Sequence, residues 1–108
     1  MFALSSKCSF CREGVPLFKE ILKSRREGNQ IKFVAITQEN PEEFQKFINE
    51  NQLDFDTVIS VEFEKIGISG TPTIALLDDT GKIRSLVIGK PNQEQIDELR
   101  KNIFALSQ

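Results

Sequence analysis

Apolar residues along this chain form short continuous runs that alternate with stripes of helical spacing. Two runs, over residues 2–5 and 31–37, predict strands, because continuous apolar stretches are typical of strands covered on both faces. Residues 9–26 carry an apolar stripe with helical periodicity and predict one helix, kinked where Pro16 falls inside it. Basic residues followed by glycine, over residues 24–29, predict the end of this helix.

The middle of the chain continues this alternation. A second helix is predicted to begin with Asn40 as its N-cap and Pro41 as its first residue. We interpret the acidic residues around this start as a solvated helix face. Residues 53–68 are less regular. They predict a short extended piece over residues 57–59, and then one or two helical turns that end at Gly67.

The last third of the chain predicts a hairpin and a helix. Residues 74–77 and 82–88 are expected to be antiparallel strands joined by a turn at residues 78–81. A final helix is predicted after Asn92. Its apolar stripe consists of Ile96, Leu99, Ile103 and Leu106. The order predicts an α/β fold with a central mixed sheet of about four strands. The first two strands are expected to be parallel, because a helical crossover joins them, and helices are expected on both faces.

Composition narrows the class of protein. The chain has 108 residues, which predicts one domain over residues 1–108, and its hydrophobic fraction of 39% is ordinary for a soluble globular protein. A net charge of −2 gives no electrostatic reason to expect nucleic acid or an anionic membrane as a partner. Residues 1–5 lack the features of a signal peptide, although a longer parent protein could carry a signal or a membrane tether.

The two cysteines, Cys8 and Cys11, are the candidate chemistry of the chain. They stand at the predicted joint between a strand and a helix, where helix N–H groups stabilise a thiolate. A structural zinc site would need two more cysteine or histidine ligands, and the chain has no histidine. A static disulfide is the other structural alternative, but so short a loop stabilises the fold little. The pair therefore favours a redox-active dithiol. Lys7 is expected to lower the pKa of Cys8 further, unless its side chain points to water.

Several motifs, taken in order, resemble the thioredoxin fold. They are the Cys-Ser-Phe-Cys sequence at residues 8–11, Pro16, the Gly-Thr-Pro-Thr sequence at residues 70–73, and the hairpin with Asp-Thr-Gly at residues 79–81. The extra segment at residues 40–60 makes the chain most similar to extracytoplasmic thiol-disulfide oxidoreductases of the TlpA/ResA type. The resemblance implies a three-layer sandwich, here without the family's N-terminal strand, as in a domain excised from a longer protein. It also implies an extracytoplasmic location and leaves a cytoplasmic one open.

The resemblance implies a role for each matching residue. Cys8 would be the nucleophile and Cys11 the resolving thiol. Pro72 would be a cis-proline facing the dithiol, and Thr71 would offer its backbone to an extended substrate. The substrate-binding set that it implies is Ser9, Phe10, Gly70, Thr71 and Pro72.

Some positions depart from the family pattern. Phe2 stands where thioredoxins usually carry a buried acid, and Lys7 where they tend to carry tryptophan. The position at which the related reductases often have glutamate is Gly14, with Glu13 one place earlier. The proton from Cys11 would therefore have to pass to Glu13 or to water. Pro16 and Lys7 complete the set of expected supporting residues.

The function expected from these residues is thiol-disulfide exchange with protein substrates. The protein is expected to act more as a reductant of substrate disulfides than as an oxidant. It would need no metal and no cofactor beyond the Cys8–Cys11 disulfide, together with an upstream electron donor or acceptor. A second hypothesis is a redox sensor or interaction module without turnover, in which Phe10 is a docking contact. A third is a peroxidase. Ser5 fits that motif, but Met1 stands where its proline should be.

Overall fold

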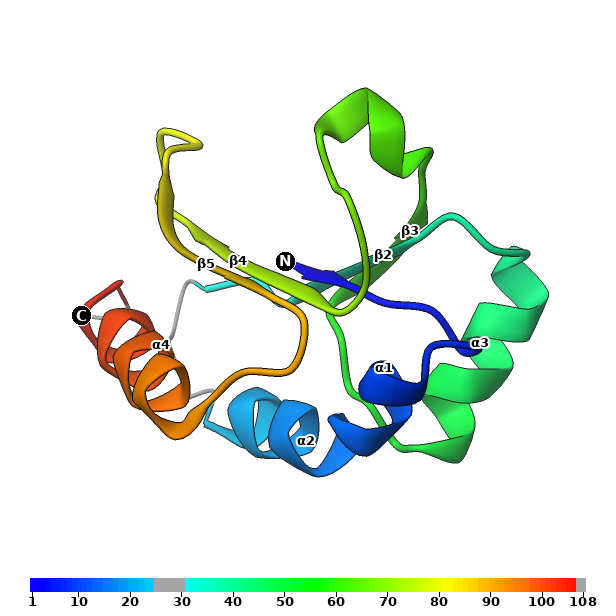
Figure 1. Cartoon of the computed structure of the whole chain (residues 1–108), viewed down its shortest axis with the longest axis horizontal. Helices are drawn as coiled ribbons and strands as arrows, with labels where there is room; N and C mark the ends of the chain where they lie inside the picture. Colours follow the sequence, from blue (N-terminus) through cyan, green and yellow to red (C-terminus); the bar gives the residue numbers. More distant parts are fainter. Residues whose placement is uncertain (25–30, 107–108) are drawn as a thin grey trace.

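A five-stranded mixed sheet forms the centre of the computed structural model, which describes residues 1–24 and 31–106 (Figure 1). The strands are β1 (Phe2–Ala3), β2 (Val34–Thr37), β3 (Thr57–Ser60), β4 (Thr73–Leu77) and β5 (Ile83–Ile88). Their order across the sheet is β3-β2-β1-β4-β5. β2 runs parallel to both β1 and β3, as the helical crossover after β1 requires, whereas β4 is antiparallel to β1 and β5.

The sheet has one strand more than the four that the sequence predicts. The additional strand is β3, whose four residues pair in parallel register with all of β2, from Val34 opposite Thr57 to Thr37 opposite Ser60. Only Val58 of this edge strand is even half-buried. An edge strand that is so exposed does not need the continuous apolar run that marks the central strands. The sequence of residues 57–60 therefore predicts only a short extended piece.

The helix after β1 is two helices rather than one kinked helix. α1 (Ser9–Glu13) and α2 (Val15–Lys23) meet at Gly14, and Pro16 lies in the first turn of α2, where its missing N–H costs no helical hydrogen bond. Gly14 allows the Phe18 ring to pack close to the backbone, since an added Cβ atom would stand 2.6 Å from Phe18 Cζ. The predicted helix end at residues 24–29 falls almost wholly outside the described residues.

The remaining helices begin where the sequence predicts. In α3 (Pro41–Glu50), the Asn40 side chain accepts hydrogen bonds from the N–H groups of Glu42 and Glu43. A 3₁₀ turn, η1 (Phe63–Ile66), ends at Gly67 with φ of 76°.

α4 (Gln93–Leu106) starts with a reciprocal pair of hydrogen bonds. The Gln95 N–H donates to Asn92 Oδ1 at 2.8 Å, and the Asn92 N–H donates to Gln95 Oε1 at 3.0 Å. Leu99 and Ile103 of the predicted stripe are buried and Ile96 is half-buried, while the environment of the Leu106 side chain lies outside the description. No described helix is both long and apolar enough to cross a bilayer.

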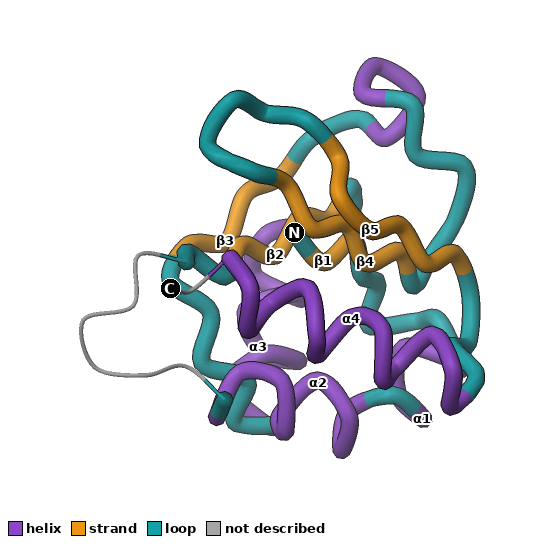
Figure 2. Tube along the Cα trace, turned by 90° about the vertical axis from the view of Figure 1, so that its left-hand side faces the viewer, coloured by secondary structure: helices purple, strands orange, loops and turns teal. Residues whose placement is uncertain are grey.

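The two faces of the sheet are covered unequally (Figures 1 and 2). Buried side chains of all four α-helices join one large core, which includes Phe2, Cys11, Phe18, Phe44 and Leu99. The opposite face holds a small core of Ala3, Ile36 and Phe63. All four α-helices therefore lie on one face of the sheet, and the helices expected on the opposite face are represented among the described residues by η1. The segment that holds Cys8 and Cys11 lies beyond the carboxyl end of β1.

Candidate active site

The two cysteines occupy one tight turn at the start of α1. Cys8 is the N-cap of this helix, with extended backbone angles, and its Sγ accepts the Cys11 N–H at 3.2 Å. The Cys8 N–H in turn donates to the Ser5 carbonyl oxygen at 3.2 Å, which fixes the approach of the chain. Both thiols are free. The sequence folds in this way because Cys8 ends the extended segment and satisfies an otherwise unpaired helix N–H group.

The environments of the two sulfur atoms drive their pKa values apart. Partial burial alone would raise the pKa of Cys8, but hydrogen bonds from Cys11, from the Thr71 side chain and from the backbone of Cys11 and Phe10 outweigh it and lower that pKa. Cys11 is completely buried, and burial together with its interaction with Cys8 raises its pKa to about 12. Cys8 is therefore the thiol that ionises first as the pH rises, and Cys11 is held as a protonated thiol.

Residues far along the chain complete the site. The Cys8 thiol donates to the Thr71 carbonyl oxygen at 3.4 Å, and the Thr71–Pro72 peptide bond is cis. Pro72 is buried, and its carbonyl oxygen accepts the Gly89 N–H at 2.8 Å. The Gly70 carbonyl oxygen accepts the Thr73 hydroxyl at 2.7 Å. Among the described residues, no acceptor takes the Thr71 N–H, so this group is left for an external partner.

The other predicted residues lie around the turn. Ser9 and Phe10 are exposed, with 49% of Phe10 accessible beside the half-buried Cys8. The Lys7 ammonium lies 3.7 Å from the Glu43 carboxylate and is largely exposed, and it is not among the groups that lower the pKa of Cys8.

Two more of the predicted supporting residues lie further along the helices. Glu13 and Pro16 are both exposed. Neither makes a described hydrogen bond to a sulfur atom. No group of three or more His, Cys, Asp or Glu side chains in the described part of the chain is placed to hold a metal ion.

Phe2 occupies the position where thioredoxins usually carry a buried acid. Its ring is buried and packs at 5.6 Å between centroids against Phe18 and at 5.2 Å against Phe55, both edge to face, with Phe33 at 6.5 Å. Edge-to-face packing of this kind is favourable for aromatic rings, whereas burying a carboxylate among them would cost free energy because its charge would be unpaired. This part of the site is a hydrophobic support for the active-site turn.

Sequence analysis missed a carboxylate that holds the turn in place. Glu39 Oε1 accepts the Ser6 N–H at 2.8 Å, and Glu39 Oε2 accepts the Ser6 hydroxyl at 2.7 Å. The interpretation of the acidic residues around the start of α3 as a solvated face describes the exposed Glu42 and Glu43 but not Glu39, which is half-buried. Its place directly before the N-cap Asn40, rather than inside the first helical turn, was the available signal.

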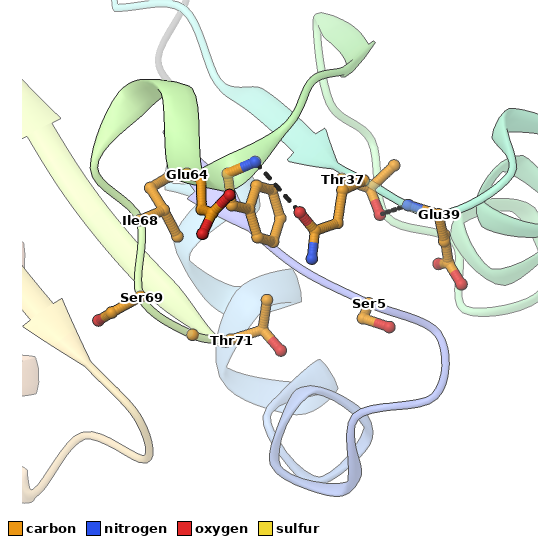
Figure 3. Close-up of a pocket in the computed structure, with 10 residues that line it drawn as sticks. Ser5, Thr37, Glu39, Glu64, Ile68, Ser69 and Thr71 are labelled. Atoms are coloured by element: carbon orange, nitrogen blue, oxygen red, sulfur yellow. Dashed lines mark hydrogen bonds between the residues drawn. The ribbon is translucent and has the colours of Figure 1, made fainter.

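A polar pocket of about 610 Å³ opens beside Thr71 (Figure 3). Residues from the segment after β1, from the end of β2, from η1 and from the loop before Pro72 line it, and they include Ser5, Glu39, Glu64, Ser69 and Thr71. The labelled side chains in Figure 3 come from three separate stretches of the chain and surround a common opening. The site thus combines the Cys8 thiol with its lowered pKa, a Thr71 N–H without an acceptor in the described part of the chain, and an adjoining cavity.

Comparisons with known proteins agree with this geometry. A family model described as thioredoxin-like matches residues 1–83. No curated protein sequence matches the chain. Among solved structures, the chain is similar to a thiol-disulfide isomerase from Corynebacterium glutamicum, with 22% identity and a TM-score of 0.78 over 99% of this chain and 78% of that chain.

Two further structures show the same architecture. A putative thiol:disulfide interchange protein DsbE from Chlorobium tepidum has 20% identity and a TM-score of 0.79 over 99% of this chain and 77% of that chain. An exposed lipoprotein thioredoxin from Streptococcus pneumoniae has 20% identity and a TM-score of 0.67 over 97% and 82%. At these identities the likeness establishes the fold alone. The family match over most of the sequence establishes more, and the chain belongs to the thioredoxin-like family.

Proposed function

We propose that this protein is a thiol-disulfide oxidoreductase that acts on proteins through Cys8 and Cys11. The Cys8 thiolate attacks a substrate disulfide, forming a mixed disulfide and releasing the first substrate thiol. Cys11 then attacks Cys8 Sγ, which releases the second substrate thiol and leaves a Cys8–Cys11 disulfide. The observation that carries the proposal is the contrast within one turn between Cys8, with its lowered pKa, and the buried Cys11, with its raised pKa.

The substrate would bind as an extended segment beside the reactive sulfur. Thr71 supports this because its carbonyl oxygen lies at Cys8 Sγ and its N–H has no acceptor in the described structure. Gly70 and Pro72 flank that backbone, and the exposed Ser9 and Phe10 would contact the substrate from the other side. Partners would be protein thiols and disulfides together with an electron donor or acceptor. The exchange itself needs no bound cofactor.

We propose reduction as the physiological direction and an extracytoplasmic location. Both follow the resemblance to the TlpA/ResA type, and the similarity to an exposed lipoprotein thioredoxin supports the location. The reduction potential of the Cys8–Cys11 pair, measured against glutathione, tests the direction. A value near about −270 mV is expected of a reductase, whereas a value near about −120 mV would identify an oxidant.

Reduction of insulin with a recycling reductant tests the activity. The wild-type protein should turn over, and Cys8→Ser should abolish turnover because the remaining thiol, Cys11, is buried and protonated. Cys11→Ser should stop at a mixed disulfide through Cys8, which can be isolated under non-reducing conditions. A wild-type protein that shows no turnover, or a mixed disulfide through Cys11, would overturn the proposal.

The second candidate is a redox sensor or interaction module that binds a partner without turnover. Phe2 favours it, because the buried acid that assists proton transfer in thioredoxins is replaced by an aromatic ring. The exposed Phe10 ring beside Cys8 would then be a docking contact. Stable binding of a partner protein in the absence of insulin reduction would favour this function over the first.

A further inference from the structure

The polar pocket beside Thr71 lies where a bound substrate would extend away from the reactive sulfur. Thr71 belongs to both features, because its carbonyl oxygen lies 3.4 Å from Cys8 Sγ and it also lines the pocket. Side chains of an extended segment alternate between its two sides, so a residue close to the target cysteine would point into the pocket. A role for this pocket in substrate binding thus rests on the proposed function, in which a substrate binds beside Thr71.

The charged groups that line the pocket are both carboxylates, those of Glu39 and Glu64, and no lysine or arginine is among the lining residues. The Glu39 oxygens accept hydrogen bonds from the uncharged N–H and hydroxyl of Ser6, so its charge is stabilised and not neutralised.

The nearest lysines along the chain are engaged elsewhere. Lys65, which follows Glu64, lies 3.4 Å from the Glu62 carboxylate, and Lys7 lies at Glu43. The pocket therefore presents uncompensated negative charge to whatever enters it.

A second polar group at the pocket has a fixed orientation. Gln38 Oε1 accepts the Phe63 N–H at 3.1 Å, which leaves the Gln38 NH₂ group as a donor. Such a donor suits the backbone carbonyl of a bound polypeptide. The remaining lining combines polar and apolar residues, namely Ser5, Thr37, Ser69, Gly70 and Thr71 with Phe63 and Ile68. Such a lining suits a long side chain that has an apolar stem and a polar end.

We propose that this pocket is a specificity subsite that takes a lysine or arginine side chain close to the target cysteine of the protein substrate. An acidic residue at that position would meet two carboxylates and be disfavoured, because like charges brought together across an interface raise the free energy of the complex. The site would thus select substrates by charge, in addition to any sequence-independent pairing with the Thr71 backbone.

Three model peptides test the subsite. Each is a heptapeptide with one cysteine held as a mixed disulfide with thionitrobenzoate, and the peptides differ only in having Arg, Ser or Glu next to that cysteine. Release of the coloured thiol by the reduced protein gives kcat/KM. We expect the Arg peptide to react about five- to tenfold faster than the Glu peptide at low ionic strength, as for a few partly exposed charge pairs. The ratio should shrink as salt is added.

Two matched variants assign the effect. Glu64→Gln should reduce the Arg-to-Glu ratio to within about threefold, because one of two carboxylates is removed. Glu42→Gln is the control. It removes an exposed carboxylate that does not line this pocket, leaves the Lys65–Glu62 pair in place, and should leave the ratio as in the wild type. Equal rates for the Arg and Glu peptides in the wild type, or an unchanged ratio in Glu64→Gln, would overturn the proposal.

The Ser peptide separates failure of the subsite from failure of the proposed function. A Ser peptide that reacts while charge has no effect leaves the exchange activity intact and removes the subsite. If no peptide reacts, binding to Cys8→Ser is followed by NMR. Larger shifts of the Glu64 and Ser69 amides with the Arg peptide than with the Glu peptide support the subsite, and equal or absent shifts overturn it.

Discussion

The carbonyl oxygen of Thr71 lies 3.4 Å from the Sγ atom of Cys8, although 63 positions separate the two residues in the chain. This contact joins the loop before β4 to the turn after β1, and no acceptor among residues 1–24 and 31–106 takes the backbone N–H of Thr71. The thiol and the surface on which a substrate would lie are therefore one structural unit, and changes to either should be measurable at the other.

The first prediction concerns the order in which the thiols react. Because the pKa of Cys8 is lowered, a larger fraction of it is thiolate at neutral pH than for an ordinary cysteine, whereas Cys11 with a pKa of about 12 stays protonated. Substoichiometric iodoacetamide at pH 7 should label Cys8 alone, as mapped by mass spectrometry. The pH midpoint of its alkylation should lie below about 8.5. Labelling of Cys11 first, or a midpoint at or above that value, contradicts the prediction.

The second prediction concerns the Thr71 side chain. It lowers the pKa of both Cys8 and Cys11, so Thr71→Val, which keeps the shape and removes the hydroxyl, should move the alkylation midpoint of Cys8 to higher pH. The thiolate fraction and the alkylation rate at pH 7 should fall accordingly. Thr71→Ser restores a hydroxyl and should return the midpoint toward that of the wild type. Identical midpoints in the Val and Ser variants would show that the hydroxyl has no such effect.

The third prediction concerns Glu39. Glu39→Gln replaces a carboxylate that accepts two hydrogen bonds from Ser6, and one of the two Ser6 donors would then face an NH₂ group. We expect the free energy of unfolding in urea to fall by about 1–2 kcal/mol, in the range for hydrogen bonds to charged groups. Glu43→Gln is the control, because it removes only an exposed ion pair to Lys7, worth less than about 1 kcal/mol. Equal effects of the two substitutions would argue against a special role for Glu39.

The fourth prediction concerns the break between α1 and α2. A Cβ atom at Gly14 would stand 2.6 Å from the buried Phe18 ring, so Gly14→Ala should destabilise the fold by about 1–3 kcal/mol, as overpacking does. Gly70→Ala offers a comparison, since nothing lies within 4 Å of an added Cβ atom there. Thermal unfolding of the two variants should separate them. A Gly14→Ala protein as stable as the wild type would mean that the Phe18 ring moves aside at little cost.

Local patterns in the sequence were enough to identify the cysteine pair. A strand-like run, a Cys-x-x-Cys spacing and a helical stripe specify where the two thiols stand, and the family resemblance points to Thr71 and Pro72. The structure also confirms the predicted fold class and the predicted starts of α3 and α4. These predictions succeeded because helix caps and apolar stripes are local signals in the sequence.

Two of the features that the sequence did not predict depend on contacts between distant residues. β3 is an edge strand whose pairing with β2 leaves no apolar run, and Glu39 binds a residue 33 positions away. The division of the helix at Gly14 is a local feature, and Pro16 marked the place as a kink without showing that two helices result. The close approach of the Phe18 ring to Gly14 became visible only in the structure.

The break at Gly14 also separates the turn that holds the two cysteines from the helix that packs into the core, so the two can be varied independently. α1 contributes Cys11 alone to the core, whereas α2 contributes Phe18, Ile21 and Leu22 on its own. Residues 9 and 10 can therefore be varied as a dipeptide library without repacking the longer helix. Because the reduction potential follows the stability of the Cys8 thiolate, such a library would retune the electron chemistry on an otherwise constant scaffold.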